Sequence, residues 1–257
     1  MRRISVAITL VLVLVVGPGV ADEKSSSSPT VDSLKPDADG FITIFNGKDL
    51  SGWEGLEDYW TVKDGVISGH ETKDKSKQTF LVFTGGYPAG WLKPDNFELR
   101  LKYKFATPDG NSGVQFRSKI LDPKTYRVGG YQADFDAQAG YDGTVYDEAS
   151  VAGGRGTMSN RGEKSTWDAD NKRMNEKLEK SGEELKKLIN VGDWNDVVLV
   201  AKGNHITYTI NGQLMTDLTD DSPKSLKDGV IAFQLHAGYT MEIQFKDVKI
   251  KMLGGEK

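Results

Sequence analysis

Polar side chains able to hold a ligand recur at every second position in three segments of the chain, at 112–118, 131–136 and 231–236. These residue types make fixed hydrogen bonds and charge-assisted pairs. If the segments are neighbouring strands, the polar side chains line one groove; if not, they form an ordinary outer sheet face with an Arg117–Asp134 ion pair. The positions are Gln115, Arg117, Gln132, Asp134, Asp136, Gln234 and His236.

A groove with this lining suits a carbohydrate. Sugars need planar amide, carboxylate and guanidinium partners together with an aromatic ring to stack on. Trp91, in a glycine-rich loop, and Trp167 are the tryptophans we expect at the surface. Trp53, Trp60 and Trp194 stand beside turns at strand ends, and large aromatics in such places usually pack in the core.

The rest of the chain from Phe41 onward predicts antiparallel strands. Apolar and polar residues alternate without interruption at 97–105 and 241–250, which is typical of strands buried on one face. Asp64-Gly65 predicts a tight hairpin turn inside 60–68, and segments 197–201 and 205–210 predict another hairpin. The pattern favours an all-β sandwich of antiparallel sheets.

One segment, 152–190, departs from this pattern and reads as an insertion. It begins with the glycine-rich loop 153–156 and then becomes highly charged. Ser181 and Glu184 have the spacing of a capping box and predict a short helix that places Leu185, Leu188 and Ile189 on one face. The insertion either covers a site or is a solvated excursion between strands.

Composition limits the classes of protein and partner. The chain has 257 residues, a net charge of −4 and no cysteine, so disulfides, thiolate metal sites and cysteine nucleophiles are excluded. The negative charge argues against nucleic acid as a partner. Residues 1–21 predict a secretory signal peptide and 22–39 a flexible polar linker, so we expect a periplasmic or secreted protein with no stable membrane anchor after signal removal.

Five motifs together resemble one family, that of the 3-keto-disaccharide hydrolases, also described as 3-keto-glucoside lyase/3-keto-2-hydroxy-glucal hydratase domains. They are FNGKDLSGW at 45–53, NSGVQFR at 111–117, GYQAD at 130–134, GTVYDE at 143–148 and FKDVKI at 245–250. The resemblance covers 40–253 and implies a concanavalin A-like jelly-roll sandwich that acts on a glycoside or oligosaccharide. It implies that the site is lined by Asn111, Gln115, Arg117, Asp134, Tyr146, Asp147 and Glu148.

The chemistry of such substrates gives these side chains roles. A ketone at C3 makes the hydrogen on C2 acidic, so a base can remove it and the enolate can expel the group at C1 before water adds. We expect Asp134 to be the base, Arg117 to stabilise the enolate, and His236 or Glu148 to donate a proton. Gln132, Asp136, Gln234 and Trp91 complete the expected substrate-binding set.

Two other functions remain open at this stage. Retaining β-glucanases with this type of fold carry the pattern Glu-x-Asp-x-Glu on one strand. This chain has Gln132-x-Asp134-x-Asp136 instead, and glutamine cannot be a nucleophile. A lectin-like carbohydrate-binding module is the non-catalytic alternative.

No cofactor is required by any motif. The three histidines lie on separate segments without metal-binding spacing. A divalent cation such as Ca²⁺ could bind the acidic clusters at 146–148 and 217–221, although solvated turns account for them better.

Overall fold

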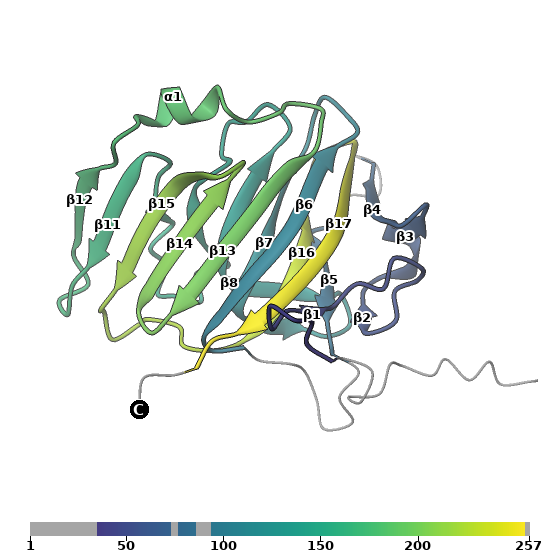
Figure 1. Cartoon of the computed structure of the whole chain (residues 1–257), viewed down its shortest axis with the longest axis horizontal. Helices are drawn as coiled ribbons and strands as arrows, with labels where there is room; N and C mark the ends of the chain where they lie inside the picture. The colour runs from purple at the N-terminus through teal and green to yellow at the C-terminus, as the bar shows by residue number, and fades with distance from the viewer. Residues whose placement is uncertain (1–34, 73–76, 86–93, 255–257) are drawn as a thin grey trace, which may run out of the picture.

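The chain forms two β-sheets packed face to face (Figure 1). The structure is a computed structural model, and it describes residues 35–72, 77–85 and 94–254. In these ranges nearly all regular structure is β, the pairing is almost wholly antiparallel, and the one α-helix is short. The predicted all-β jelly-roll sandwich is confirmed.

The larger sheet has ten strands, and its outer face is toward the viewer in Figure 1. Only β11 and β15 pair in parallel within it. Strand β1 (Ile42–Thr43) pairs with β17 beside the main path. Across the sheet the order is β12 (Arg173–Lys177), β11 (Glu163–Trp167), β15 (Gln213–Asp220), β14 (His205–Ile210), β13 (Asn195–Lys202), β6 (Phe97–Phe105), β17 (Met241–Met252), β4 (Val66–Glu71) and β3 (Trp60–Lys63).

The smaller sheet has seven strands and contains all three segments that carry the predicted site. Strand β8 pairs with β7, and β7 pairs with β16. Segments 131–136, 112–118 and 231–236 are therefore neighbouring strands, which is the alternative that predicts a groove. The order is β10 (Thr157–Ser159), β9 (Val145–Glu148), β8 (Arg127–Asp136), β7 (Asn111–Asp122), β16 (Val230–Leu235), β5 (Thr79–Phe83) and β2 (Trp53–Glu54).

Aromatic rings from facing strands fill the space between the sheets. Phe233 of β16 stacks on Phe245 of β17 at 4.0 Å between ring centroids, and Tyr103 of β6 stacks on Phe135 of β8 at the same distance. Burial of each ring contributes about 2–3 kcal/mol, which makes these contacts a large part of what holds the sheets together. Trp53 and Trp60 lie in the core as expected, whereas Trp194 is only half-buried.

Local turn and cap signals produce the predicted elements. Asp64 and Gly65 have φ values of 52° and 77°, as a tight hairpin turn requires, and join β3 to β4. Helix α1 (Gly182–Lys186) begins at Ser181, which forms the predicted capping box with Glu184. Leu185 is buried beneath the helix, but Leu188 lies beyond its end and is exposed, so the predicted apolar face is shorter than expected.

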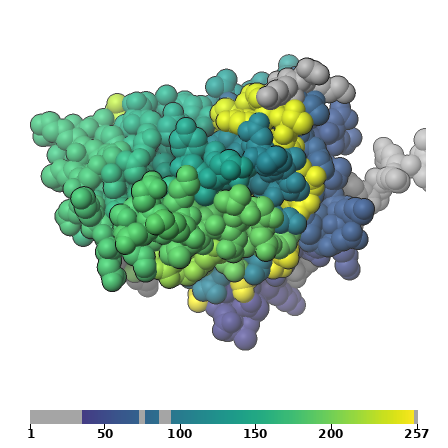
Figure 2. Space-filling model, turned by 90° about the horizontal axis from the view of Figure 1, so that it is seen from above, coloured from purple at the N-terminus to yellow at the C-terminus, as the bar shows by residue number. Residues whose placement is uncertain are grey.

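Segment 152–190 is part of the sandwich. It supplies β10 to the edge of the smaller sheet and β11 and β12 to the edge of the larger one, which makes it more than a solvated excursion. Figure 2 shows this green segment at one end of the molecule and the purple-to-blue N-terminal strands at the other. Within the described ranges, no helix is long and apolar enough to cross a membrane. The predicted signal peptide, and the predicted linker as far as residue 34, lie outside those ranges.

Candidate functional site

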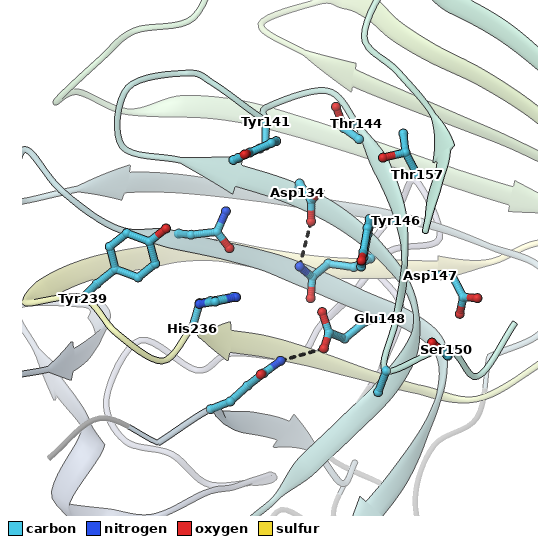
Figure 3. Close-up of a pocket in the computed structure, with 14 residues that line it drawn as sticks. Asp134, Tyr141, Thr144, Tyr146, Asp147, Glu148, Ser150, Thr157, His236 and Tyr239 are labelled. Atoms are coloured by element: carbon cyan, nitrogen blue, oxygen red, sulfur yellow. Dashed lines mark hydrogen bonds between the residues drawn. The ribbon is translucent and has the colours of Figure 1, made fainter. Parts of the chain in front are cut away.

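An open pocket of about 470 Å³ lies on the outer face of the smaller sheet, over β9, β8, β7 and the end of β16 (Figure 3). This volume is in the range of ordinary small-ligand sites. Acidic, amide, hydroxyl and aromatic side chains line it, and neither lysine nor arginine is among the described residues that do so. The lining residues are Gln78, Asn111, Gln132, Asp134, Tyr141, Thr144, Tyr146, Asp147, Glu148, Ala149, Ser150, Thr157, His236 and Tyr239.

Gln132 connects the three central strands beneath the pocket. Its Oε1 accepts a hydrogen bond from Gln115 of β7. Its Nε2 donates to Asp134 Oδ1 at 2.7 Å and to Gln234 Oε1 of β16 at 3.1 Å. Gly113 of β7 makes room for this side chain, because a Cβ there would come within 2.6 Å of Gln132 Cγ. The amide of Gln132 is thus fully engaged and fixed in orientation.

Glu148, at the end of β9, is the second carboxylate of the site. Gln78 Nε2 donates to its Oε1 at 2.6 Å, and Gln234 Nε2 reaches its Oε2 at 3.5 Å. Since Gln234 is also bound to Gln132, a continuous chain of amides joins Glu148 to Asp134.

Burial and neighbouring acids raise the pKa of Asp134 well above its usual value. Desolvation of the charged form is the largest cause, and the negative charge of Glu148 adds to it. The hydrogen bond from Gln132 acts in the opposite direction by favouring the ionised form. A carboxyl group with a raised pKa is a stronger base once it is ionised, and this suits it to accept a proton from carbon.

His236 follows β16 and presents its ring to the pocket (Figure 3). Its Nδ1 lies 2.8 Å from the carbonyl oxygen of Ala237. A carbonyl can only accept, so Nδ1 carries a hydrogen, and Nε2 has no hydrogen-bond partner among the described residues. The ring of Tyr239 meets the imidazole edge-on, with 5.6 Å between the centroids.

Arg117 is not in the pocket, so its expected role as enolate stabiliser is wrong. The side chain is 1% exposed. Its guanidinium donates to backbone carbonyls of three separate loops, at 2.6 Å to Asp95, 2.8 Å to Gly203 and 3.3 Å to Leu226. Arg117 therefore fastens one end of the sandwich together, and the proposed Arg117–Asp134 ion pair does not form.

A β-bulge explains why alternation failed at this position. The β7–β8 register shifts between Phe116 and Lys119, and Arg117 has a φ of 46°. An extra residue in one strand reverses which face the next side chain occupies. Gly229 permits the bulge, because a Cβ there would lie 2.4 Å from the carbonyl carbon of Arg117.

The carboxylates of two other acidic residues accept hydrogen bonds from backbone N–H groups and are not available to a substrate. The expected substrate ligand Asp136 does not line the pocket; its Oδ1 accepts from the backbone N–H groups of Gln138 and Gly140 in the turn after β8. Asp147 borders the pocket, but its carboxylate is bound by the N–H groups of residues 152, 154 and 155 at 2.6–2.9 Å. Asp147 consequently shapes the pocket wall.

Gln115 and Gln234 were expected to bind substrate, and this expectation is wrong: both support other side chains of the site. Both side chains have no exposed area, and neither reaches the pocket surface. Each instead holds Gln132, while Ser118 Oγ donates to Gln115 Oε1 at 2.7 Å. The two glutamines lie one layer below the groove, where they orient the groups that do reach it.

Residues 40–251 match the family described as the 3-keto-alpha-glucoside-1,2-lyase-like domain. The chain belongs to this family. A curated relative, the 3-keto-disaccharide hydrolase of Bacteroides thetaiotaomicron, is 33% identical over 117 residues, covering 41% of this chain and 37% of that protein. The match thus spans little more than a third of the relative.

Solved structures share the fold of this 3-keto-alpha-glucoside-1,2-lyase-like domain. A provisionally named glycosyl hydrolase of Parabacteroides distasonis superposes with a TM-score of 0.53 and 22% identity, over 84% of this chain and 95% of that one. A Bacillus subtilis protein of unknown function with a galectin-like fold gives a TM-score of 0.53 and 12% identity, over 84% and 96%. Both likenesses support the jelly-roll assignment.

The lyase-like domain frames its pocket with tyrosines, of which Tyr146 was expected from the family resemblance and the others were not. Tyr141 and Tyr146 are 57% and 37% exposed, and Tyr239 stands beside His236. These rings, and not the expected tryptophans, are the aromatic side chains that line the pocket in the described ranges. Of the two tryptophans expected at the surface, Trp91 lies outside the described residues, and Trp167 is buried with its Nε1 donating to Met158.

Gln78 and Tyr239 could not be found by strand alternation, because each lies just outside a strand. Gln78 precedes β5, and its partner Glu148 is 70 positions away in the chain. The clue for Tyr239 was its position three residues after His236, at the end of a strand whose polar face had already been recognised.

The acidic clusters considered for Ca²⁺ have protein partners. Asp220 pairs with Arg155 at 2.7 Å, and Asp217 Oδ1 lies 2.8 Å from His205 Nε2. Asp147 is bound by backbone N–H groups. Within the ranges that the structure describes, no three histidine, cysteine or acidic side chains are grouped as a metal site.

Proposed function

We propose that this domain cleaves 3-keto-glycosides by elimination across C1 and C2, followed by hydration of the unsaturated sugar. The observation that carries the proposal is the joining of Asp134 and Glu148 through one amide network in a sugar-sized pocket that also contains His236. Family membership and the curated relative support the substrate class.

Asp134 removes the hydrogen on C2, and the electron pair of that bond forms an enolate with the C3 carbonyl. The enolate then forms the C1–C2 double bond as the C1–O bond breaks. His236, protonated at Nε2, gives its proton to the departing oxygen. Water next adds its hydroxyl to C1 and gives its remaining proton to His236 Nε2, while Asp134 returns its proton to C2, so both side chains regain their starting states.

Asn111 replaces Arg117 as the group that stabilises the enolate oxygen. It lines the pocket at the start of β7, and its side-chain amide has no hydrogen-bond partner within the described chain. Both hydrogens of the Gln132 amide are already donated, so that neighbour cannot fill the role. A fixed neutral donor at a developing oxyanion lowers the barrier because it needs no reorganisation.

The pocket also favours uncharged substrates. It contains several acidic groups, and neither lysine nor arginine is among its described lining residues, so an anionic aglycone would be repelled. We therefore propose neutral 3-keto-glucosides as the substrate class, with the sugar ring against the tyrosines.

The proposal is tested with neutral 3-keto-glucosides and their unoxidised parents, each with and without a chelator. We expect release of the aglycone from the ketones alone, together with uptake of deuterium at C2 in heavy water. Cleavage of the parents in place of the ketones would contradict the mechanism. Saturable binding of the sugars with no product would instead support a carbohydrate-binding module.

A further inference from the structure

A second groove, of about 720 Å³, opens on the outer face of the larger sheet, on the opposite side of the sandwich from the sugar pocket. Its floor is formed by β17, β6 and β13, and its wall by the loop at 43–47 and the turn at Gly65. In Figure 1 this face is toward the viewer, with β1 beside β17. The sugar pocket and its chemistry make no use of it.

Cations are concentrated on two neighbouring strands of this face. We call this group of cations the basic stripe. It contrasts with the chain as a whole, which carries a net charge of −4. The register sets Lys246 opposite Lys102 and Lys249 opposite Arg100, and like charges directly across a strand pair are destabilising. An anionic ligand would relieve that repulsion. The basic stripe consists of Arg100, Lys102, Lys104, Lys246, Lys249 and Lys251.

The charge of the stripe is only partly neutralised within the protein. Arg100 pairs with Glu98, and Lys102 pairs with Asp196 at 2.7 Å. In the described part of the chain, none of the other four lysines has a carboxylate within ion-pair distance. These four are Lys104, Lys246, Lys249 and Lys251.

Aromatic rings hold these lysines in place. Lys246 Nζ lies 4.0 Å, and Lys104 Nζ 5.1 Å, from the ring centroid of Trp194. Lys249 Nζ and Lys251 Nζ lie 4.7 and 5.7 Å from that of Phe41. Cation–π contacts leave the ammonium hydrogens free to bind an anion while restricting the side chain, which lowers the entropy lost on binding.

We propose that the basic stripe and its groove bind an acidic polysaccharide, a chain of sugars with regularly repeated carboxylate groups. Side chains on one face of a strand recur about every 6.8 Å, so the stripe presents a row of cations to an extended polyanion. Asp196 and Asp247 border the groove, and their charges would repel a flat anionic membrane, whereas a single chain can lie between them. The net negative charge disfavours nucleic acid.

The test measures binding of the full chain to polygalacturonate at low and high salt, with neutral dextran as the comparison. We expect binding to polygalacturonate alone, weakened at high salt because the contacts are exposed ion pairs. A variant with Lys104→Gln, Lys246→Gln, Lys249→Gln and Lys251→Gln should bind roughly tenfold or more weakly. A matched variant replaces four exposed lysines away from the groove, Lys164, Lys172, Lys177 and Lys187, by glutamine and should bind like the parent.

Three results would overturn the proposal. They are no binding by the parent, equal loss in both variants, or binding to phosphatidylglycerol vesicles without binding to polygalacturonate. Turnover of a neutral 3-keto-glucoside should be unchanged in the stripe variant. That measurement also keeps this proposal distinct from the proposed catalytic function, since either one can fail alone.

Discussion

Gln132 Nε2 donates a hydrogen bond to Asp134 Oδ1 over 2.7 Å, although both residues belong to the same strand. Residues two apart on a strand share a face, and here the long amide lies along that face toward the shorter carboxylate. The contact leaves Oδ2 of Asp134 without a hydrogen-bond partner among the described residues. The orientation of this carboxylate is therefore set by Gln132, whose own amide is held by Gln115 of β7 and Gln234 of β16.

Asp134→Asn should abolish exchange of the C2 hydrogen and lower turnover of 3-keto-glucosides by about 10²–10⁴-fold, because the base is lost while size and shape are kept. Deuterium uptake at C2 measures the first effect directly. Asp136→Asn is the matched control: the amide oxygen can still accept the two turn N–H groups, so activity should persist. Normal exchange in Asp134→Asn would clear this residue of the role.

The same carboxyl group should set the acid limb of the pH–rate profile. Burial raises the pKa of Asp134, and the base acts only when ionised, so kcat/KM should rise with pH through a value above the ordinary carboxyl range. A rate profile for the protein across acidic and neutral pH checks this. An acid limb near the pKa of an exposed aspartate would contradict the assignment.

Gly113→Ala should lower activity while the sandwich stays folded. The new methyl group would meet Gln132 Cγ at 2.6 Å and the carbonyl oxygen of Ala133 at 2.8 Å, and would push the Gln132 amide away from Asp134. Misplacement of a reacting group by about 1 Å can cost roughly 100-fold in rate. Kinetics and a circular dichroism spectrum together measure the effect. Gly254→Ala, where a Cβ meets nothing within 4 Å and φ is not in the left-handed region, controls for glycine loss as such.

Sequence alternation predicted strands well where one face is buried and the register is regular. The expected strand at 97–105 coincides with β6, and the three site segments are indeed neighbours. Period-two patterns report burial directly, which is why these predictions hold. Asp134 and His236 reach the predicted pocket for the same reason.

The errors arise where long-range packing decides the outcome. Arg117 follows a bulge that no local pattern announces, and its partners lie 22, 86 and 109 positions away. The alternation places Asp136 correctly on the polar face, but a turn captures its carboxylate. A sequence can therefore show which strand positions are polar, but not which of those side chains will be taken up by hydrogen bonds to the backbone.

Asn111→Ala should reduce kcat for 3-keto-glucosides by about 10²–10³-fold with little change in KM, because the amide acts on charge that develops in the transition state. Steady-state kinetics measure the two constants separately. Thr157→Ala, which removes another polar group lining the pocket, is the comparison and should alter mainly KM. If Asn111→Ala raised KM and left kcat unchanged, Asn111 would have a role in ground-state binding instead.

Arg117→Lys should destabilise the fold by about 3 kcal/mol or more and leave the chemistry of the folded enzyme intact. Lysine cannot reproduce the fork that serves three loops, so buried carbonyl groups lose their donors. Urea unfolding measures the free energy, and kcat at low urea measures the chemistry. A stable variant with a strongly reduced kcat would restore Arg117 to a direct role in the reaction.

Asp142→Asn should make the fold more stable than the parent at neutral and alkaline pH. Burial raises the pKa of Asp142 to about 7, and Tyr103 donates a hydrogen bond to its carboxylate between the sheets. The folded state thus holds a proton that the unfolded chain releases at the ordinary value. The parent therefore loses roughly 1.4 kcal/mol for each pH unit as pH rises from the ordinary carboxyl pKa to the raised one.

Asparagine resembles the protonated carboxyl group and does not titrate, so the variant should lack this slope. Free energies of unfolding for both proteins across this pH range provide the measurement. The difference should be small at acidic pH, grow toward the raised pKa and stay constant above it. A parent whose stability rises over the same interval, relative to the variant, would show that Asp142 is ionised in the folded core and is stabilised there by Tyr103 and the nearby charge of Arg161.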